Sequence, residues 1–171
     1  MIKPKPLPAL KRLQELFELD KEGQLRWRQT RSNFVKAGDK VGTKTSSGHY
    51  QTHVDGQPYM VHRIVWMLHN QADPGLLQVD HINGDRADNR PCNLRLATHE
   101  QNAINRSCKV SSNTGLTGIY FHSRCPNRPY SAKVGNNHLG FFETIKEAAS
   151  VRSNYLETYA GEFNPNVCRK N

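Results

Sequence analysis

Apolar residues near the start of the chain recur at the spacing of an amphipathic helix. Leu10, Leu13 and Phe17 share one face when residues 8–19 are read as a helix, because residues three and four apart lie on the same side of a helix. The turn that follows leads into a short stretch with strand character over residues 24–28. The pattern predicts an N-terminal helix followed by a short strand.

A strand–turn–strand pattern occupies residues 50–61, with Asp55-Gly56 at its centre. Asp-Gly supplies the left-handed backbone that a two-residue hairpin turn needs, so the segment predicts a β-hairpin. Residues 62–68 then read as a helix, and a short strand over residues 77–79 follows a Pro-Gly break. The helix would supply four core residues, which are Ile64, Val65, Trp66 and Leu68.

Residues 79–106, VDHINGDRADNRPCNLRLATHEQNAINR, are mostly polar. Turn-forming residues dominate their first half, which predicts an irregular loop. Thr98 and Gln101 have the spacing of a capping box, so a helix should begin near His99 and run to about Arg106. The order of hairpin-like chain, loop and helix predicts a ββα unit at about residues 77–106.

The last third of the chain has a different pattern. Three short segments with strand character are followed by a second capping box, formed by Thr144 and Glu147, and Gly161 is the expected C-cap. The helix between them would bury an apolar face made of Ile145, Ala148, Ala149, Leu156 and Tyr159. The strand candidates are residues 118–122, 130–134 and 138–142. A small three-stranded antiparallel sheet packed on one helix is therefore expected.

The predicted fold class is α+β, and a length of 171 residues suits one ordinary domain or two small ones. The predicted domains are residues 1–106, with an N-terminal helix and hairpin before the ββα core, and residues 118–171. Small polar residues over 107–117 predict the linker between them.

The chain is basic. It has 24 Lys+Arg against 15 Asp+Glu, which gives a net charge of +9. A domain this basic usually meets a polyanion, because each cation set against a phosphate releases condensed counterions. The alternative is a basic surface that only keeps the protein soluble.

No apolar run of about 18 residues is present, and the N-terminus has no apolar segment of the kind found in signal peptides. A cytoplasmic location is expected, in the host cell if the chain is phage-encoded, rather than secretion. The four cysteines, Cys92, Cys108, Cys125 and Cys168, form no CxxC pair, so free thiols are expected. A zinc site drawn from Cys92, His99 and Cys108 lacks the usual paired spacing.

The polar stretch contains groups that suit phosphodiester hydrolysis, which needs an activated water and a cation near the phosphate. Asp80 offers a hard oxygen ligand, and the adjacent His81 titrates near neutrality and would accept a proton from water. Asn102 would supply a second oxygen ligand, and the Asn93 amide would hold either the loop backbone or the histidine ring. Oxygen ligands favour Mg²⁺ or Mn²⁺ over zinc. The alternative is a turn with satisfied side chains in an ordinary loop.

The spacing of Asp80-His81, Asn93 and Asn102 resembles the HNH endonuclease family, in the branch that ends in asparagine. The surrounding HRIVW, DHINGD, DNRPCNLR and ATHEQN segments resemble it too, over about residues 60–106. The resemblance implies a ββα-metal fold, with Asp80 and Asn102 as metal ligands, His81 as general base and Asn93 as the residue that orients it. The segment before it is similar to the N-terminal portion of phage-borne HNH proteins.

GIYFHS, YSAKV and HLGFFETIKEAA, within about residues 115–161, resemble the DNA-binding domain of plant ethylene-response factors. In that family the outer face of the sheet reads the major groove, which implies a DNA-binding role for the matching positions. Those positions are Thr117, Tyr120, His122, Lys133, Asn136 and His138. The alternative is a sheet used for packing or protein contact.

These features together predict a metal-dependent DNA endonuclease of phage or mobile-element (homing) type that acts on double-stranded DNA. Further phosphate contacts are expected from basic residues around the site, which are Arg63, Arg86, Arg90, Arg95, Arg106 and Lys109. A monomer would nick one strand, and a homodimer would cut both. The alternatives are a sequence-specific DNA-binding protein with an inactive nuclease fold, and a nuclease directed at RNA.

Overall fold

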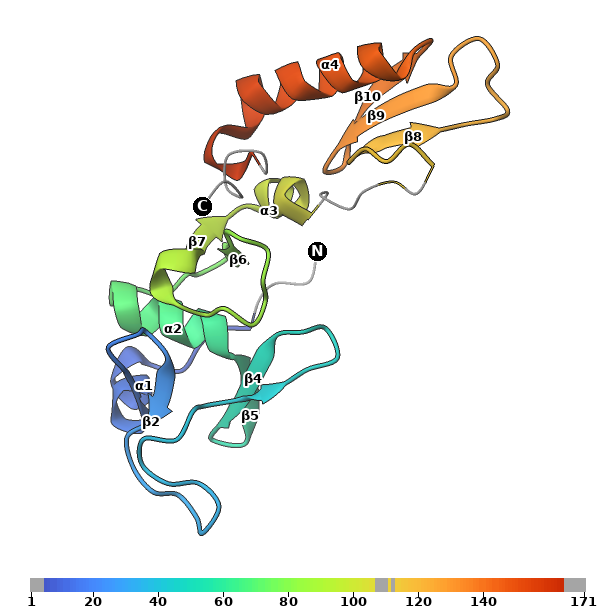
Figure 1. Cartoon of the computed structure of the whole chain (residues 1–171). Coiled ribbons are helices and arrows are strands. Elements are labelled where there is room, and N and C mark those ends of the chain that lie inside the picture. Colours follow the sequence, from blue (N-terminus) through green and yellow to red (C-terminus); the bar gives the residue numbers. More distant parts are fainter. Residues whose placement is uncertain (1–4, 107–110, 112, 165–171) are drawn as a thin grey trace. The chain divides into compact units, whose positions relative to one another are not determined.

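The structure is a computed structural model that describes residues 5–106, 111 and 113–164 (Figure 1). The chain divides into two compact units, Met1–Leu96 and Ala97–Asn171, which we describe separately. The predicted boundary after residue 106 differs from this division. The reason is that Ile104 packs with Val134 and Leu156, so the helix after the polar loop groups with the second unit.

The first unit begins with helix α1, Leu10–Leu16, and continues directly into strand β1, Phe17–Leu19. The helix was predicted to reach residue 19, and that prediction is wrong at its end. Phe17 is extended and pairs with Trp27 of strand β2, Leu25–Trp27, and the two rings lie 4.8 Å apart. Cross-strand aromatic pairing stabilises a sheet, and here it prevails over local helical periodicity.

A three-stranded antiparallel sheet follows, in the order β3-β4-β5. Its strands are β3, Thr43–Lys44, β4, Tyr50–Val54, and β5, Gln57–Met60. Asp55 and Gly56 have φ angles of 50° and 75°, as a tight hairpin turn between β4 and β5 requires. The predicted hairpin is therefore confirmed.

Helix α2, Val61–Asn70, forms the centre of the first unit. Ile64 and Val65 are fully buried, and Leu68 is nearly so, while Trp66 packs against the core and is partly exposed. Each fully buried side chain of this size stabilises the fold by about 1.5–3 kcal/mol. The helix packs against α1, β1, β4 and β5, so it joins the N-terminal helix and the two small sheets in one core.

Strands β6, Gln78–His81, and β7, Leu94–Ala97, pair in a two-stranded sheet. The loop between them ends in a 3-10 helix, Pro91–Asn93. β7 was not predicted, because its four residues, LRLA, lie inside a mostly polar segment. Val79 and Leu94 belong to the core of the first unit, so this core anchors both strands.

The second unit contains α3, His99–Arg106, and a sheet in the order β10-β9-β8 packed on helix α4. Ile119, Ala132 and Ala148 are buried between sheet and helix, which confirms the predicted sheet-on-helix module. Its elements are β8, Ile119–Phe121, β9, Tyr130–Val134, β10, Asn137–Phe142, and α4, Ile145–Tyr155.

Helix α4 continues as a π-helix, Leu156–Ala160, and a 3-10 helix, Gly161–Phe163. Leu156 is buried as predicted, but Tyr159 is 70% exposed. A π-helix has a wider turn than an α-helix, so residues after Leu156 no longer follow the α-helical face. Gly161, with a φ of 49°, ends the π-helix. Within the described residues, no helix has the length and apolar character needed to cross a membrane.

The capping box at α4 gives a stability prediction. Thr144 Oγ1 accepts a hydrogen bond from the Glu147 amide, and Glu147 Oε2 accepts one from the Thr144 amide. Replacing Thr144 with alanine is expected to lower the free energy of unfolding by about 1 kcal/mol, because the helix loses its N-cap. Chemical denaturation would measure this, with Ser150→Ala on the exposed side of α4 as the control. An equal loss in both variants would contradict the capping account.

Candidate active site

Asp80 and His81 are the last two residues of β6, directly after the buried Val79. Each is 5% exposed. Adjacent residues of a strand point to opposite sides, so the two side chains meet different surroundings. A buried carboxylate beside a buried imidazole is costly unless both are hydrogen-bonded, and the neighbouring residues supply those partners.

Asp80 is paired with Arg95, which lies on the neighbouring strand β7. Arg95 Nε donates to Asp80 Oδ2 at 3.0 Å, and the two side chains are 10% and 6% exposed. Arg95 was predicted to contact phosphate. In the structure it is buried and neutralises the carboxylate, as a buried charge requires.

The His81 ring is anchored by Asn89. His81 Nε2 lies 3.0 Å from Asn89 Oδ1 in a buried contact. An amide oxygen only accepts hydrogen bonds, so this contact favours a His81 ring that carries a hydrogen on Nε2. The sequence prediction assigned no role to Asn89. Its position in the same polar loop, eight residues after the histidine, was the available signal.

Asn93 holds the loop that carries Asn89. Its Oδ1 accepts from the Asn83 amide at 3.0 Å, and its Nδ2 donates to the Asp88 carbonyl at 2.8 Å. Its own carbonyl accepts from the Ile82 amide at 2.9 Å. Of the two options raised by the sequence, these contacts correspond to holding the loop backbone, and the ring contact comes from Asn89.

An exposed ion pair also shapes this loop. Arg90 Nη2 lies 2.7 Å from Asp88 Oδ2, and its hydrogen bonds lower the pKa of the Asp88 carboxyl. Arg90 was predicted to meet phosphate, and it is exposed. The loop is thus ordered by its own side chains as well as by Asn93.

Two further histidines surround His81, and the sequence prediction gave neither a role. The ring centroids of His49, His62 and His81 lie 5.1–5.7 Å apart. Burial, then the charges of His81, His49 and Arg63, holds the pKa of His62 well below its usual value. The pKa of His49 is lowered to about 4, mainly by partial burial and to a smaller extent by the charges of Arg86 and His81. At neutral pH His49 and His62 are therefore neutral.

These two histidines make stability depend on pH. Each has a lower pKa when folded than when unfolded, so below about pH 6.5 the unfolded chain binds more protons. The free energy of unfolding is therefore expected to fall as the pH drops from about 6.5 to about 4. Urea unfolding across this range would measure it. His49→Gln should flatten the slope, and an unchanged slope in that variant would contradict the assignment.

Asn102, the predicted second metal ligand, lies on α3 in the second unit and is partly buried. The predicted capping box starts this helix, with the Thr98 amide donating to Gln101 Oε1 at 2.8 Å and the Gln101 amide donating to Thr98 Oγ1 at 3.2 Å. The predicted helix bounds, His99 to about Arg106, are confirmed.

The other basic residues predicted near the site differ in exposure. Arg63 is half-buried, and its guanidinium faces the carbonyls of residues 75 and 77 at 3.5 and 3.4 Å. Burial lowers its pKa. Arg86 is exposed and donates to the Ser47 carbonyl at 2.7 Å. Arg106 is the last residue of α3, but its side chain, like the whole of Lys109, lies outside the described residues.

The second unit brings several predicted DNA-binding residues to one face of its sheet. Ser131 of β9 pairs with Tyr120 of β8. Two residues further along β9, Lys133 pairs with His138 of β10. Cross-strand partners and residues two apart share a face. His122 joins this face through its Nε2, which lies 2.8 Å from Ser131 Oγ.

Phe141 is an exposed residue of the same face that the sequence prediction missed. It pairs with Ser131, is 43% exposed, and lies 5.4 and 4.9 Å from the rings of His122 and His138. Two predicted positions remain. Thr117 lies just before β8, and Asn136 lies in the turn between β9 and β10. The face is therefore aromatic and polar.

The donor chemistry at Asp80 suits a hard divalent cation, because a buried carboxylate is an oxygen ligand. The Arg95 guanidinium already places positive charge against one of its oxygens. Within the residues that the structure describes, no group of three or more His, Cys, Asp or Glu is arranged to hold a metal. Cys92 and Cys125 are free thiols as expected, and Cys108 and Cys168 lie outside the described residues.

Comparison with known proteins shows a similarity to HNH endonucleases. Residues 59–104 match the model of the HNH endonucleases. Over 119 residues the chain is 29% identical to an uncharacterized HNH endonuclease of Acanthamoeba polyphaga mimivirus, an alignment that covers 67% of this chain and 60% of that relative. The ethylene-response-factor likeness lies beyond the family match and stays a prediction. No solved structure matches the chain. The segment that carries Asp80, His81, Asn89, Asn93 and Asn102 is thus similar to HNH endonucleases, which supports a nuclease enzyme.

Proposed function

We propose that this protein is a metal-dependent endonuclease that hydrolyses phosphodiester bonds in double-stranded DNA. The observation that carries the proposal is the buried Asp80-His81 pair, with His81 Nε2 held 3.0 Å from Asn89 Oδ1. Its position inside the segment similar to HNH endonucleases supports the same reaction class.

His81 is the proposed general base. Its Nδ1 accepts a proton from the attacking water, and Asn89 keeps the ring in the tautomer that allows this. Asn93 acts through the loop, because its amide fixes the backbone at Asn83 and at Asp88, the residue directly before Asn89. Base and anchors therefore come from one short stretch of the first unit.

Asp80 and Asn102 are the proposed ligands of Mg²⁺ or Mn²⁺. When bound, the cation stabilises negative charge on the phosphate and on the leaving 3′ oxygen. Arg95 keeps the buried Asp80 carboxylate compensated. Asp80 is thus held in place before a cation arrives.

We also propose the wider setting of the reaction. A single site of this kind hydrolyses one strand, so a monomer would nick DNA and a homodimer would cut both strands. The outer face of the β8-β9-β10 sheet, with Tyr120, Lys133 and His138, would position the enzyme on its target. The enzyme is of phage or mobile-element (homing) type and acts in the host cytoplasm.

One observation favours a second candidate, a DNA-binding protein that no longer cuts. The Arg95 guanidinium contacts Asp80 Oδ2 at 3.0 Å, and a tightly held guanidinium would compete with a cation for that carboxylate. In this candidate the second unit's sheet still binds DNA, but no metal-dependent product forms.

Incubation with supercoiled plasmid distinguishes the two candidates. The endonuclease is expected to produce open-circular DNA with Mg²⁺ or Mn²⁺ and none with EDTA. Early linear product would indicate a dimer. Binding without product in every metal would favour the second candidate, and cleavage of single-stranded RNA but not of plasmid would point to an RNA-directed nuclease.

A further inference from the structure

The segment between β2 and β3 is a projecting basic loop, which we define as residues 28–40 (Figure 1). It contains four basic residues and one acid, Asp39, so its net charge is +3. Asp39 Oδ2 accepts a hydrogen bond from the Lys36 amide at 2.7 Å, so this carboxylate stabilises the backbone of the loop. The basic residues, all exposed, are Arg28, Arg31, Lys36 and Lys40.

Hydrogen bonds hold the basic loop in one conformation. At its tip, Ser32 Oγ accepts from the amides of Phe34 and Val35 at 3.2 and 3.1 Å, and the Arg31 amide donates to the Val35 carbonyl at 2.9 Å. At its base, the Gly38 amide donates to the Trp27 carbonyl at 2.7 Å. The tip is therefore a fixed turn joined to β2.

Phe34 stands at this tip and is 94% exposed. Single exposed apolar residues are common on protein surfaces. What sets Phe34 apart is that a hydrogen-bonded turn presents its whole ring on a loop that carries four cations, one of which, Arg28, faces Glu18 at 3.6 Å. Proteins that kink DNA insert an apolar side chain of this kind between base steps, while neighbouring cations contact the phosphates.

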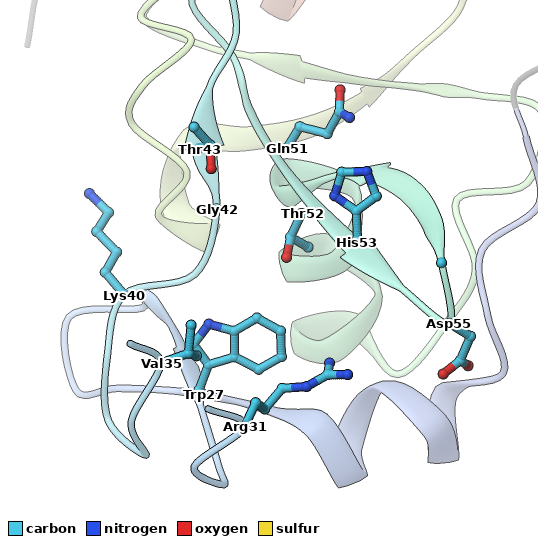
Figure 2. Close-up of a pocket in the computed structure, with 11 residues that line it drawn as sticks. Trp27, Arg31, Val35, Lys40, Gly42, Thr43, Gln51, Thr52, His53 and Asp55 are labelled. Carbon is cyan, nitrogen blue, oxygen red and sulfur yellow. The ribbon is translucent and has the colours of Figure 1, made fainter. Parts of the chain in front are cut away.

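A cavity of about 440 Å³ lies between the basic loop and the β3-β4-β5 sheet (Figure 2). On the loop side, the Arg31 guanidinium lies 5.0 Å from the Trp27 ring, and the Lys40 ammonium lies 5.0 Å from the Tyr50 ring. The strands contribute four polar residues, which are Thr43, Gln51, Thr52 and His53. Aromatic contacts thus position two cations along the edge of the cavity.

One carboxylate, Asp55, also lines this cavity and offsets part of its positive charge. Asp55 accepts two hydrogen bonds from Arg12, at 2.7 and 3.2 Å, while Arg12 also contacts Glu15 at 3.1 Å. Arg31, Lys40 and the polar strand residues then leave the cavity cationic and rich in donors. Such a surface is complementary to a phosphate backbone.

We propose that the basic loop is a DNA-kinking element, in which Phe34 enters a base step of the duplex while Arg31 and Lys40 contact the flanking phosphates. This surface lies outside the Asp80-His81 site and outside the sheet of the second unit. The inference rests on the proposed function only for its choice of DNA as the polyanion.

The test uses the full chain and a short duplex with a donor and an acceptor dye at its ends, in EDTA so that no cleavage occurs. Phe34→Ala is expected to weaken duplex binding about tenfold, the scale of one lost base contact, and to abolish the change in energy transfer that reports the kink. Phe34→Leu should retain both effects in large part. Leu76→Ala, another exposed apolar residue of the first unit at 73% exposure, is the matched control.

Salt dependence tests the charged part of the proposal. Replacing Arg31 and Lys40 together with glutamine is expected to reduce the slope of log affinity against log salt by about 2, whereas Phe34→Ala should leave that slope unchanged. Lys21→Gln, an exposed lysine outside the basic loop, controls for net charge. Duplex affinity and energy transfer equal to wild type in Phe34→Ala would overturn the proposal.

Two further outcomes are informative. If Phe34→Ala weakens binding to single-stranded DNA only, the ring stacks on unpaired bases and the duplex wedge is wrong. Because these measurements need no cleavage, a protein that fails to cut plasmid can still show the kink. If the protein cleaves plasmid but Phe34→Ala binds and kinks the duplex like wild type, the proposal for the basic loop is wrong and the proposed nuclease function still stands.

Discussion

Replacing His81 with alanine is expected to slow DNA cleavage by about 10²–10⁴-fold, the usual contribution of a general base. The proposed reaction loses the group that accepts the proton from water, while the basic loop and the second unit's sheet are unchanged. DNA affinity should therefore stay near wild type. Single-turnover cleavage of a labelled duplex, together with binding measured in EDTA, would test both halves of this prediction.

Two comparisons separate a catalytic His81 from a structural one. His69→Ala, an exposed histidine at the end of α2, should cleave like wild type. Added imidazole should restore part of the activity of His81→Ala, because it replaces the missing base. A variant that loses binding along with cleavage, or that unfolds, would instead indicate a structural histidine.

Replacing Arg95 with leucine is expected to lower the free energy of unfolding by about 3–5 kcal/mol. The change leaves the Asp80 carboxylate buried without the guanidinium that neutralises it. The cost of such a charge exceeds the cost of losing one surface contact by several-fold. Urea denaturation at neutral pH would measure the difference.

A surface pair in the same region provides the control. Arg90→Leu removes the partner of Asp88, but Arg90 is 52% exposed and solvent can replace it, so a loss of less than about 1 kcal/mol is expected. The double variant Arg95→Leu with Asp80→Asn should recover part of the stability lost in Arg95→Leu. Equal small losses for Arg95→Leu and Arg90→Leu would contradict the buried-pair account.

Local signals made much of the fold predictable from sequence. The Asp55-Gly56 hairpin and the capping boxes at Thr98 and Thr144 are where the sequence placed them. Each is decided by residues within a few positions of one another, because turns and helix starts depend on short-range backbone geometry. The three strands of the second unit follow for the same reason.

The features that escaped prediction depend on residues far apart in the chain. Phe17 leaves the helix to pair with Trp27, and α3 groups with the second unit through Ile104. Tertiary contacts override local propensity in both places. No local pattern indicates such contacts, so the ends of the elements were the weakest predictions.

In the candidate site too, some residues could be predicted from the sequence, whereas the contacts between them could not. Asp80 and His81 stand out by residue type, and the structure places both in the interior at the end of β6. The contact of Asn89 with His81, the pairing of Arg95 with Asp80, and the placing of His49 beside the site are set by folding. The residue types therefore suggested the chemistry, and the fold supplied the groups that orient Asp80 and His81.

In the proposed reaction, the Asp80-His81 site cuts DNA with the help of a divalent cation. The most direct test is the initial rate of open-circle formation from supercoiled plasmid, by wild type and by His81→Ala, in Mg²⁺ and in EDTA. Product is expected from wild type in Mg²⁺, and almost none in the other three reactions. Equal rates for wild type and His81→Ala in Mg²⁺, or wild-type cleavage that persists in EDTA, would contradict the proposed reaction.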